Sequence, residues 1–168
     1  PYDQGVWSES GTTFGHLRLA IVDLSPAGRQ PMFSADERYA ITYNGEIYNF
    51  QELMHELRAL GYEFRTHCDT EVILYAWQEW GEACVERFRG MFAFAIYDAR
   101  RQCVFLARDR LGIKPLFYSL LHDGVVAFGS ELKVLKAHPK LPRSLEPRAV
   151  EDYFALGYIP EPKTIYRG

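Results

Sequence analysis

The chain has 168 residues, of which 48% are hydrophobic and 24% are charged, and its formal net charge is −3. This composition excludes a disordered chain, and the length suits one folded domain. The slight negative charge argues against nucleic acid and anionic membrane surfaces as partners, and no apolar run approaches the roughly 20 residues that span a bilayer. Three widely spaced cysteines predict neither a disulfide framework nor a metal site, which favours a reducing, cytoplasmic setting.

The first half of the sequence predicts two strands and then two helices. Residues 12–23 form a β-rich apolar run that contains one unusual charge, Arg18. A loop rich in proline and glycine follows, and residues 38–46 form a second strand-like run. Apolar residues then recur at helical spacing over residues 50–60 and over residues 69–81, with a glycine at the end of each pattern.

The second half predicts strands paired in hairpins. Residues 91–109 contain two strand-like runs around a polar turn at 98–101, and residues 116–131 contain another pair around a turn at 122–124. Two short helical patterns follow. Because hairpins predominate over βαβ crossovers, we expect an α+β fold with largely antiparallel sheets covered by helices.

Polar residues in the first half point to a binding site for an amino acid. An arginine on a rigid strand, Arg18, is suited to bidentate capture of a carboxylate. The amide of Asn44 beside the Gly45 N–H is a common arrangement for stabilising an oxyanion. Glu46 and Asp69 could accept hydrogen bonds from an ammonium group. Free glutamine would satisfy all of these groups.

Each of these residues also has a structural interpretation. A lone strand arginine is often paired with a neighbouring acid, and Asn44–Gly45 is a common tight turn. Asp69, at the start of a helical pattern, is a plausible N-cap. The alternatives stay open for single residues, but the set together favours a site.

A further charged segment, RDRLGIKPLFY at residues 108–118, has glycine spacing that does not fit a phosphate-binding loop. We expect it to be a structural turn between hairpins. Arg108, Asp109 and Lys114 are predicted to form a salt-linked scaffold in this turn.

Six strings resemble, in this order, the glutaminase domain of class II glutamine amidotransferases: GHLRLAIVDLSPAGRQPM, YNGEIYNFQEL, CDTEVILYAWQEWG, GMFAFAIYD, RDRLGIKPLFY and FGSELKVL. Within that group they are most similar to glutamine-hydrolysing asparagine synthetases, and the resemblance covers essentially the whole chain. It implies the N-terminal-nucleophile (Ntn) hydrolase fold, a four-layer α/β/β/α sandwich of antiparallel sheets, incomplete here at its N-terminus.

The resemblance also implies glutamine-binding roles for eight residues: Arg18, Leu19, Ile21, Val22, Asn44, Gly45, Glu46 and Asp69. Arg18 would bind the α-carboxylate with help from the backbone of the three apolar residues after it. Asn44 and Gly45 would form the oxyanion hole, and the two acidic residues would hold the α-ammonium group. No metal is expected in this site.

The nucleophile of the resembled family is a cysteine at the mature N-terminus, whose own α-amino group serves as the base. Residue 1 is Pro1 here, and Cys68, Cys84 and Cys103 are internal. We therefore expect that the leading strands with the nucleophile are absent and that this fragment alone is inactive. The alternative is a relative that lost glutaminase activity, a pseudo-glutaminase supporting a synthetase domain, as in β-lactam-forming synthetases. The complete glutamine-binding set favours the first interpretation.

The resemblance divides the sequence into two parts. Residues 1–145 would be the glutaminase domain, truncated at its start, and residues 146–168 the lead-in to an absent synthetase domain of the same chain. That domain would use ATP and Mg²⁺ to adenylate a carboxylate, most simply that of aspartate, and no cofactor is expected in the glutaminase part. A homodimer is common in the resembled family, and the sequence leaves the oligomeric state open.

Overall fold

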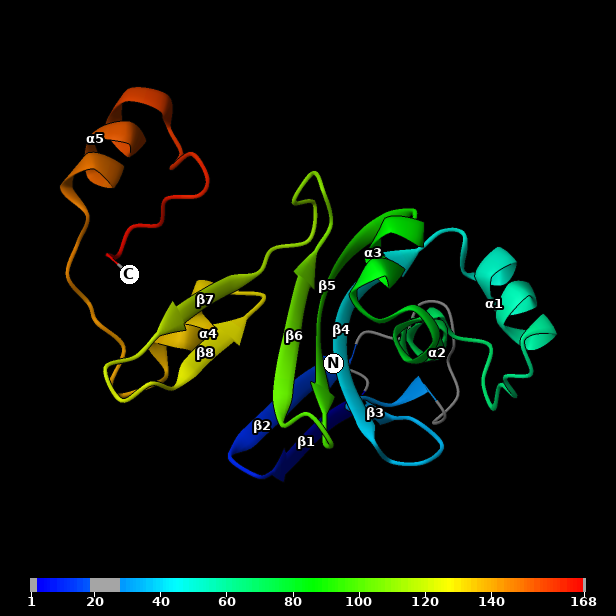
Figure 1. The fold of residues 1–168 in the computed structure, drawn as a ribbon. Helices are drawn as coiled ribbons and strands as arrows, with labels where there is room; N and C mark the ends of the chain where they lie inside the picture. Colours follow the sequence, from blue (N-terminus) through cyan, green and yellow to red (C-terminus); the bar gives the residue numbers. More distant parts are fainter. Residues whose placement is uncertain (1–2, 19–27, 168) are drawn as a thin grey trace. The chain divides into compact units, whose positions relative to one another are not determined.

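The computed structural model describes residues 3–18 and 28–167, and its Cα positions divide into two compact units, Pro1–Pro115 and Leu116–Gly168 (Figure 1). The strands are β1 (Asp3–Glu9), β2 (Thr12–Arg18), β3 (Met32–Phe33), β4 (Tyr39–Ile47), β5 (Gly90–Asp98), β6 (Cys103–Arg108), β7 (Phe117–Leu120) and β8 (Val126–Gly129). The helices are α1 (Phe50–Ala59), α2 (Asp69–Trp80), the 3₁₀ turn η2 (Gly81–Ala83), α3 (Cys84–Arg87), α4 (Leu132–Lys136) and α5 (Pro147–Leu156). No helix among them has the length and apolar character needed to cross a membrane.

The first unit is built on a four-stranded antiparallel sheet in the order β3-β4-β5-β6. Both faces of β5 are covered, and its residues 92–98 are all buried. Helices α1 and α2 cover one face of this sheet (Figure 1). The apolar residues of β4 that point to the helices are Tyr39, Ile41, Tyr43 and Ile47, and they pack with Leu57 and Ile73 in one core cluster. The helical periodicity in the sequence therefore predicted the helices and their buried faces correctly.

The antiparallel hairpin β1–β2 covers the other face of the sheet. The rings of Trp7 and Tyr97 lie 5.3 Å apart between their centroids. Trp7 is the cross-strand partner of Phe14, and Tyr97 is the partner of Ala40, so the beginning of β2 lies over the beginning of β4. Helices, sheet and hairpin give the described residues of this unit three layers, in the α+β class with antiparallel sheets that the sequence predicts. The second helix layer of the expected four-layer sandwich stays a prediction.

Strand β1 was missed by the sequence interpretation. Its turn is formed by Ser10 and Gly11, both with positive φ, 46° and 80°. Such a pair between two strands is typical of a two-residue hairpin loop, so the Ser-Gly dipeptide was the available signal.

The second unit begins with the β7–β8 hairpin, which turns at residues 121–125 as predicted. Helix α4 packs against it, and Leu121, Leu135 and Leu141 form a small core there. Helix α5 starts with Pro147 after the Glu146 N-cap and ends at Gly157, which has φ of 80°. The domain boundary expected between residues 145 and 146 stays a prediction.

The predicted turn after β6 is organised by the buried carboxylate of Asp109. Its Oδ1 accepts hydrogen bonds from the backbone N–H groups of Leu111 (3.2 Å) and Ile113 (2.9 Å), and its Oδ2 accepts from those of Lys114 (2.9 Å) and Phe92 (3.2 Å). Burial alone would raise the pKa of Asp109, but these four donors outweigh it and hold the pKa below its usual range.

The neighbouring Arg108 also binds backbone in this turn. Its Nε donates to the Lys114 carbonyl at 2.7 Å and its Nη2 donates to the Gly112 carbonyl at 2.5 Å. The scaffold role predicted for Arg108 and Asp109 is thus present. These contacts of Arg108 and Asp109 run to the backbone of the turn, and the salt links expected among Arg108, Asp109 and Lys114 stay a prediction.

Candidate active site

The candidate site lies along the outer edge of β4, beyond the end of β3. Strand β3 pairs with Ala40 and Ile41, and farther along the edge side chains replace it. The Tyr43 N–H donates to the side-chain Oε1 of Gln30 at 2.7 Å, and the Ile47 N–H donates to Oδ2 of Asp69 at 3.0 Å. Because N–H groups alternate between the two edges of a strand, the Gly45 N–H points to this same edge, between the two occupied donors. No acceptor among the described residues is recorded for it, so it is available to a ligand.

The Asn44–Gly45 pair lies within β4, where it is paired with Ala93 and Phe92, and is not a tight turn. The strand continues to Ile47, which corrects the idea that this pair ends it. A Cβ on residue 45 would lie 2.2 Å from the Met91 carbonyl oxygen and 2.7 Å from the Phe92 Cα. Glycine is therefore required here by the close approach of β4 and β5.

Asp69 is the first residue of α2, and its carboxylate is directed to β4. The side chain is buried, and Oδ2 accepts from the Tyr43 hydroxyl at 2.7 Å as well as from the Ile47 N–H. The N-cap of α2 is Cys68, without a side-chain capping bond, so the capping interpretation of Asp69 is wrong. In the described part of the chain no donor is recorded for Oδ1. This oxygen is thus left to accept a hydrogen bond from a ligand.

The loop before α2 is held by Glu71, a residue that the sequence interpretation did not single out. Its carboxylate accepts from the backbone N–H groups of Arg65 (3.0 Å) and Thr66 (2.7 Å) and from the Thr66 hydroxyl (2.6 Å). A glutamate at the third helical position is the signal that could have identified it.

Gln30 was missed as well. Its side chain is buried, accepts from the Tyr43 N–H and donates through Nε2 to the Thr70 hydroxyl at 3.4 Å. It connects β4 to the first turn of α2. It lies in a loop without a helical or strand period, inside the string GHLRLAIVDLSPAGRQPM, so membership of that string was the available signal.

Arg18 comes to the level of Asn44 on the hairpin-facing side of the sheet. His16 Nδ1 lies 3.4 Å from the Thr42 hydroxyl. This contact lies farther along β2 and β4 than the place where the first residues of the two strands overlie each other. The next inward residue of β2 is Arg18, which is buried, and the next residues on this face of β4 are Asn44 and Glu46. The alternation of side chains along both strands, continued from the His16–Thr42 contact, thus places Arg18 and Asn44 on facing sides of the two sheets.

The environment under the hairpin also affects His16. Burial and, to a lesser extent, the charge of Arg18 lower the pKa of His16 below its usual value, which keeps its ring neutral at neutral pH. Leu19, Ile21 and Val22, the other residues expected to contact the glutamine carboxylate, lie outside the described residues.

Two of the internal cysteines, Cys68 and Cys84, do not have the properties of a nucleophile. Cys68 is buried beside the Thr66 hydroxyl, 3.0 Å from its Sγ, and burial raises the pKa of its thiol. Burial raises the pKa of Cys84 to about 12. Neither is a thiolate at neutral pH, as expected for small buried residues. Among residues 3–18 and 28–167, no cluster of His, Cys, Asp and Glu is arranged to hold a metal ion.

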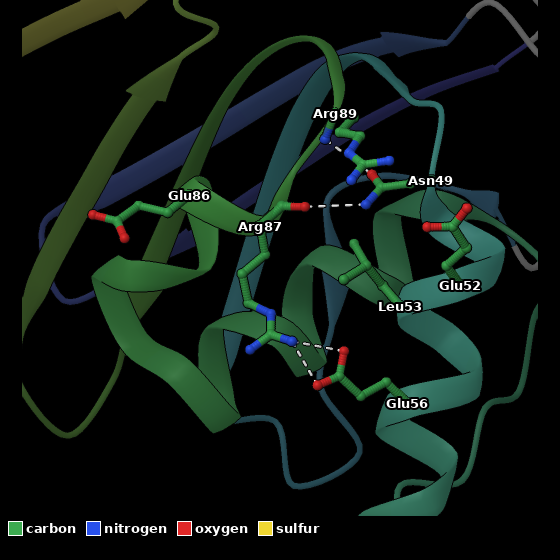
Figure 2. Close-up of a pocket in the computed structure, with 7 residues that line it drawn as sticks. All are labelled: Asn49, Glu52, Leu53, Glu56, Glu86, Arg87 and Arg89. Carbon is green, nitrogen blue, oxygen red and sulfur yellow. Dashed lines mark hydrogen bonds and ion pairs between the residues drawn. The ribbon is translucent and has the colours of Figure 1, made fainter.

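A pocket of about 350 Å³ lies elsewhere, between α1 and the segment from α3 to β5 (Figure 2). The Asn49 side chain joins its two walls, donating to the Arg87 carbonyl (3.0 Å) and accepting from the Arg89 N–H (2.9 Å). Arg87 also pairs with Glu56 at 2.5 Å. None of the predicted site residues lines this pocket, so the second asparagine of the YNGEIYN string has a structural role.

Comparisons with known proteins identify the family of this chain. The sequence model of the glutamine amidotransferase domain matches residues 1–168. Asparagine synthetase [glutamine-hydrolyzing] 3 of Bacillus subtilis (strain 168) is 44% identical over 171 residues, which cover 100% of this chain and 28% of the relative. The putative asparagine synthetase [glutamine-hydrolyzing] 2 of Methanocaldococcus jannaschii is 40% identical over 188 residues, 99% of this chain and 36% of the relative. The chain thus spans 28% and 36% of the length of these two relatives.

Among solved structures, the glutamine phosphoribosylpyrophosphate amidotransferase of B. subtilis superposes with a TM-score of 0.61 over 74% of this chain and 28% of that chain, at 24% identity. At this identity the likeness shows the fold, which is the Ntn-hydrolase type expected from the sequence. The match of the domain model over the full sequence shows the family. This chain belongs to the glutamine amidotransferase domain family.

Proposed function

We propose that this chain is the glutaminase portion of a longer, ATP-dependent asparagine synthetase-like amidotransferase. It would hydrolyse glutamine to glutamate and ammonia, and the ammonia would amidate an adenylated carboxylate, that of aspartate, in a separate domain. The names of the relatives support this proposal. The observation that carries it is the edge of β4, where a ligand-accessible N–H of Gly45 lies next to the anchored carboxylate of Asp69.

The geometry supports a specific pose of glutamine. The α-ammonium group would bind Oδ1 of Asp69, with Glu46 nearby on β4, and the α-carboxylate would pair with Arg18. The side-chain carbonyl oxygen would then accept from the Asn44 amide and the Gly45 N–H, which stabilise the oxyanion. A thiol attacking that carbonyl carbon releases ammonia and leaves a γ-glutamyl thioester, which water hydrolyses to glutamate.

The proposal assigns the nucleophile to a cysteine at the mature N-terminus, outside residues 1–168. It assigns ATP and Mg²⁺ to the synthetase domain, and no cofactor to the glutaminase site. The free thiols of Cys68, Cys84 and Cys103 fit a reducing cytoplasm. A homodimer of the full-length protein belongs to the same proposal.

The full-length protein, incubated with ATP, Mg²⁺ and aspartate, tests this function. Glutamine and ammonium chloride are compared as nitrogen donors, and glutamate and asparagine are quantified. We expect the unmodified protein to form asparagine with either donor. Replacement of the N-terminal cysteine by alanine should abolish synthesis from glutamine and leave synthesis from ammonium chloride intact. A first residue other than cysteine, with synthesis from ammonia and no glutamate formed, would instead support the pseudo-glutaminase alternative.

Arg18→Ala in the full-length protein is expected to raise KM for glutamine about 100-fold, because a buried charged hydrogen-bonding partner of the substrate is lost. Ammonia-dependent synthesis should be unchanged. The matched control is Arg29→Ala, which removes an exposed arginine paired with Asp3 at 3.2 Å. Initial rates with each donor provide the measurement, and loss of both activities in Arg18→Ala would contradict the assigned role.

A further inference from the structure

Tyr43 makes a direct contact with the residue proposed to bind the ammonium group. Its side chain is buried, and its hydroxyl donates to Oδ2 of Asp69 at 2.7 Å. Burial, followed by the negative charge of Asp69, raises the pKa of Tyr43, so the hydroxyl keeps its proton and remains a donor.

The backbone of Tyr43 is itself fixed to α2. Gln30 accepts from the Tyr43 N–H and donates to the hydroxyl of Thr70, the residue after Asp69. These four residues, Gln30, Tyr43, Asp69 and Thr70, form a closed set of contacts that we call the β4–α2 clamp. Because both ends of the clamp are buried, its parts are held in one arrangement.

Anchoring one oxygen of a carboxylate decides where the other oxygen points. The Tyr43 hydroxyl and the Ile47 N–H converge on Oδ2 of Asp69 from a side chain and from the backbone. Two donors on one oxygen fix the plane of the carboxylate and direct Oδ1 away from them. With Tyr43 lacking its hydroxyl, a single N–H at 3.0 Å would remain, and the carboxylate could rotate.

We propose that Tyr43 is a positioning residue that sets the selectivity of this site for substrates carrying an α-ammonium group, by orienting Asp69. This inference rests on the proposed glutaminase function. It concerns selectivity, because the recorded hydrogen bond of the Tyr43 hydroxyl runs to Asp69. The Tyr43 ring, whose Cε2 lies 2.9 Å from an ideal Cβ built on Gly45, is kept in the variant tested below.

The test uses the full-length protein and its Tyr43→Phe variant, which keeps the aromatic ring. KM for L-glutamine is compared with the inhibition constant of glutaramate, which has the carboxylate and amide of glutamine but hydrogen in place of the ammonium group. We expect Tyr43→Phe to raise KM for L-glutamine about tenfold and to leave the inhibition constant of glutaramate unchanged. The reason is that a hydrogen bond to a charged group is lost only on the ammonium side of the site. Tyr39→Phe, an equally buried tyrosine of β4, should change neither constant.

A double-mutant cycle gives a second, independent measurement. In the Asp69→Asn background, Tyr43→Phe should have no further effect on L-glutamine, because the two residues act as one unit. Parallel weakening of both ligands, unchanged selectivity or additive effects in the cycle would overturn the inference while leaving the glutaminase function in place. Absence of glutamine hydrolysis in the unmodified full-length protein would overturn the proposed function itself.

Discussion

Gly45→Ala is expected to lower the free energy of unfolding of the first unit by about 3 kcal/mol. The new Cβ would lie 2.2 Å from the Met91 carbonyl oxygen and 2.7 Å from the Phe92 Cα, and both are backbone atoms. A flexible side chain could move aside, but here β4 and β5 must separate. The separation would also displace the Gly45 N–H, so we expect glutamine-dependent activity of the full-length protein to be lost.

Urea unfolding followed by tryptophan fluorescence measures this change, because Trp7, Trp77 and Trp80 all lie in the first unit. Gly15→Ala is the matched control. Gly15 also lies in a strand of this unit, and a Cβ there would meet nothing within 4 Å. Equal unfolding midpoints for the two variants would show that the close approach of β4 and β5 does not constrain residue 45.

Asp109→Ala is expected to lower the free energy of unfolding by about 3 kcal/mol, because the backbone donors around the carboxylate lose their acceptor. One of these donors is the N–H of Phe92, and the Phe92 carbonyl in turn accepts from the Asp109 N–H at 2.7 Å. Phe92 is the cross-strand partner of Gly45, so the turn after β6 supports β5 directly behind the candidate site. We therefore expect weaker glutamine use in the full-length variant as well.

The same carboxylate predicts an acid dependence of stability. The pKa of Asp109 is lower in the folded than in the unfolded chain. Its contribution to the free energy of unfolding is therefore present above the unfolded pKa of about 4 and is lost as the pH falls through the folded-state pKa. Asp98 behaves likewise: burial raises its pKa, but the hydrogen bonds from Arg38 and the following backbone outweigh burial.

Urea unfolding at a series of pH values from neutral down to strongly acidic tests this dependence. Asp109→Asn should flatten the acid decline without removing it, because Asp98 still contributes. Asp123→Asn, in an exposed turn where the carboxylate pairs with Lys140, should leave both the midpoint and the pH dependence nearly unchanged. An acid decline of the same slope in Asp109→Asn and in the unmodified chain would exclude this role of Asp109.

Sequence patterns predicted the regular elements well where burial follows a simple period. The helices α1 and α2 end close to the glycines that the sequence indicated, Gly61 and Gly81, both with positive φ. The hairpin turns before β6 and β8 also lie where the sequence predicts them. Strand β3 has two residues and could not have a period of its own, and β1 alternates with little apolar content on its outer face.

The candidate site was predictable in its members and much less so in its geometry. Arg18, Asn44, Gly45, Glu46 and Asp69 were singled out by their chemistry and by a family resemblance. Their supporting contacts depend on side chains that span distant segments, such as the hydrogen bond that the Tyr43 N–H donates to the Gln30 side chain across 13 positions. Single-residue patterns carry no information about such pairings. For the same reason the capping interpretation of Asp69 was reasonable for the local sequence and wrong for the folded chain.

The outer edge of β4 has a consequence for association between molecules. An unpaired strand edge is a template on which a strand of another chain can add, and several consecutive free donors and acceptors are needed for such pairing. Here the side chains of Gln30 and Asp69 occupy the N–H groups on both sides of Gly45. In the part of the chain that the structure describes, the opening that remains is one residue wide, large enough for a carbonyl oxygen of a small molecule and too short for a foreign strand. The features that shape a ligand site at this edge therefore also oppose the addition of a foreign strand there.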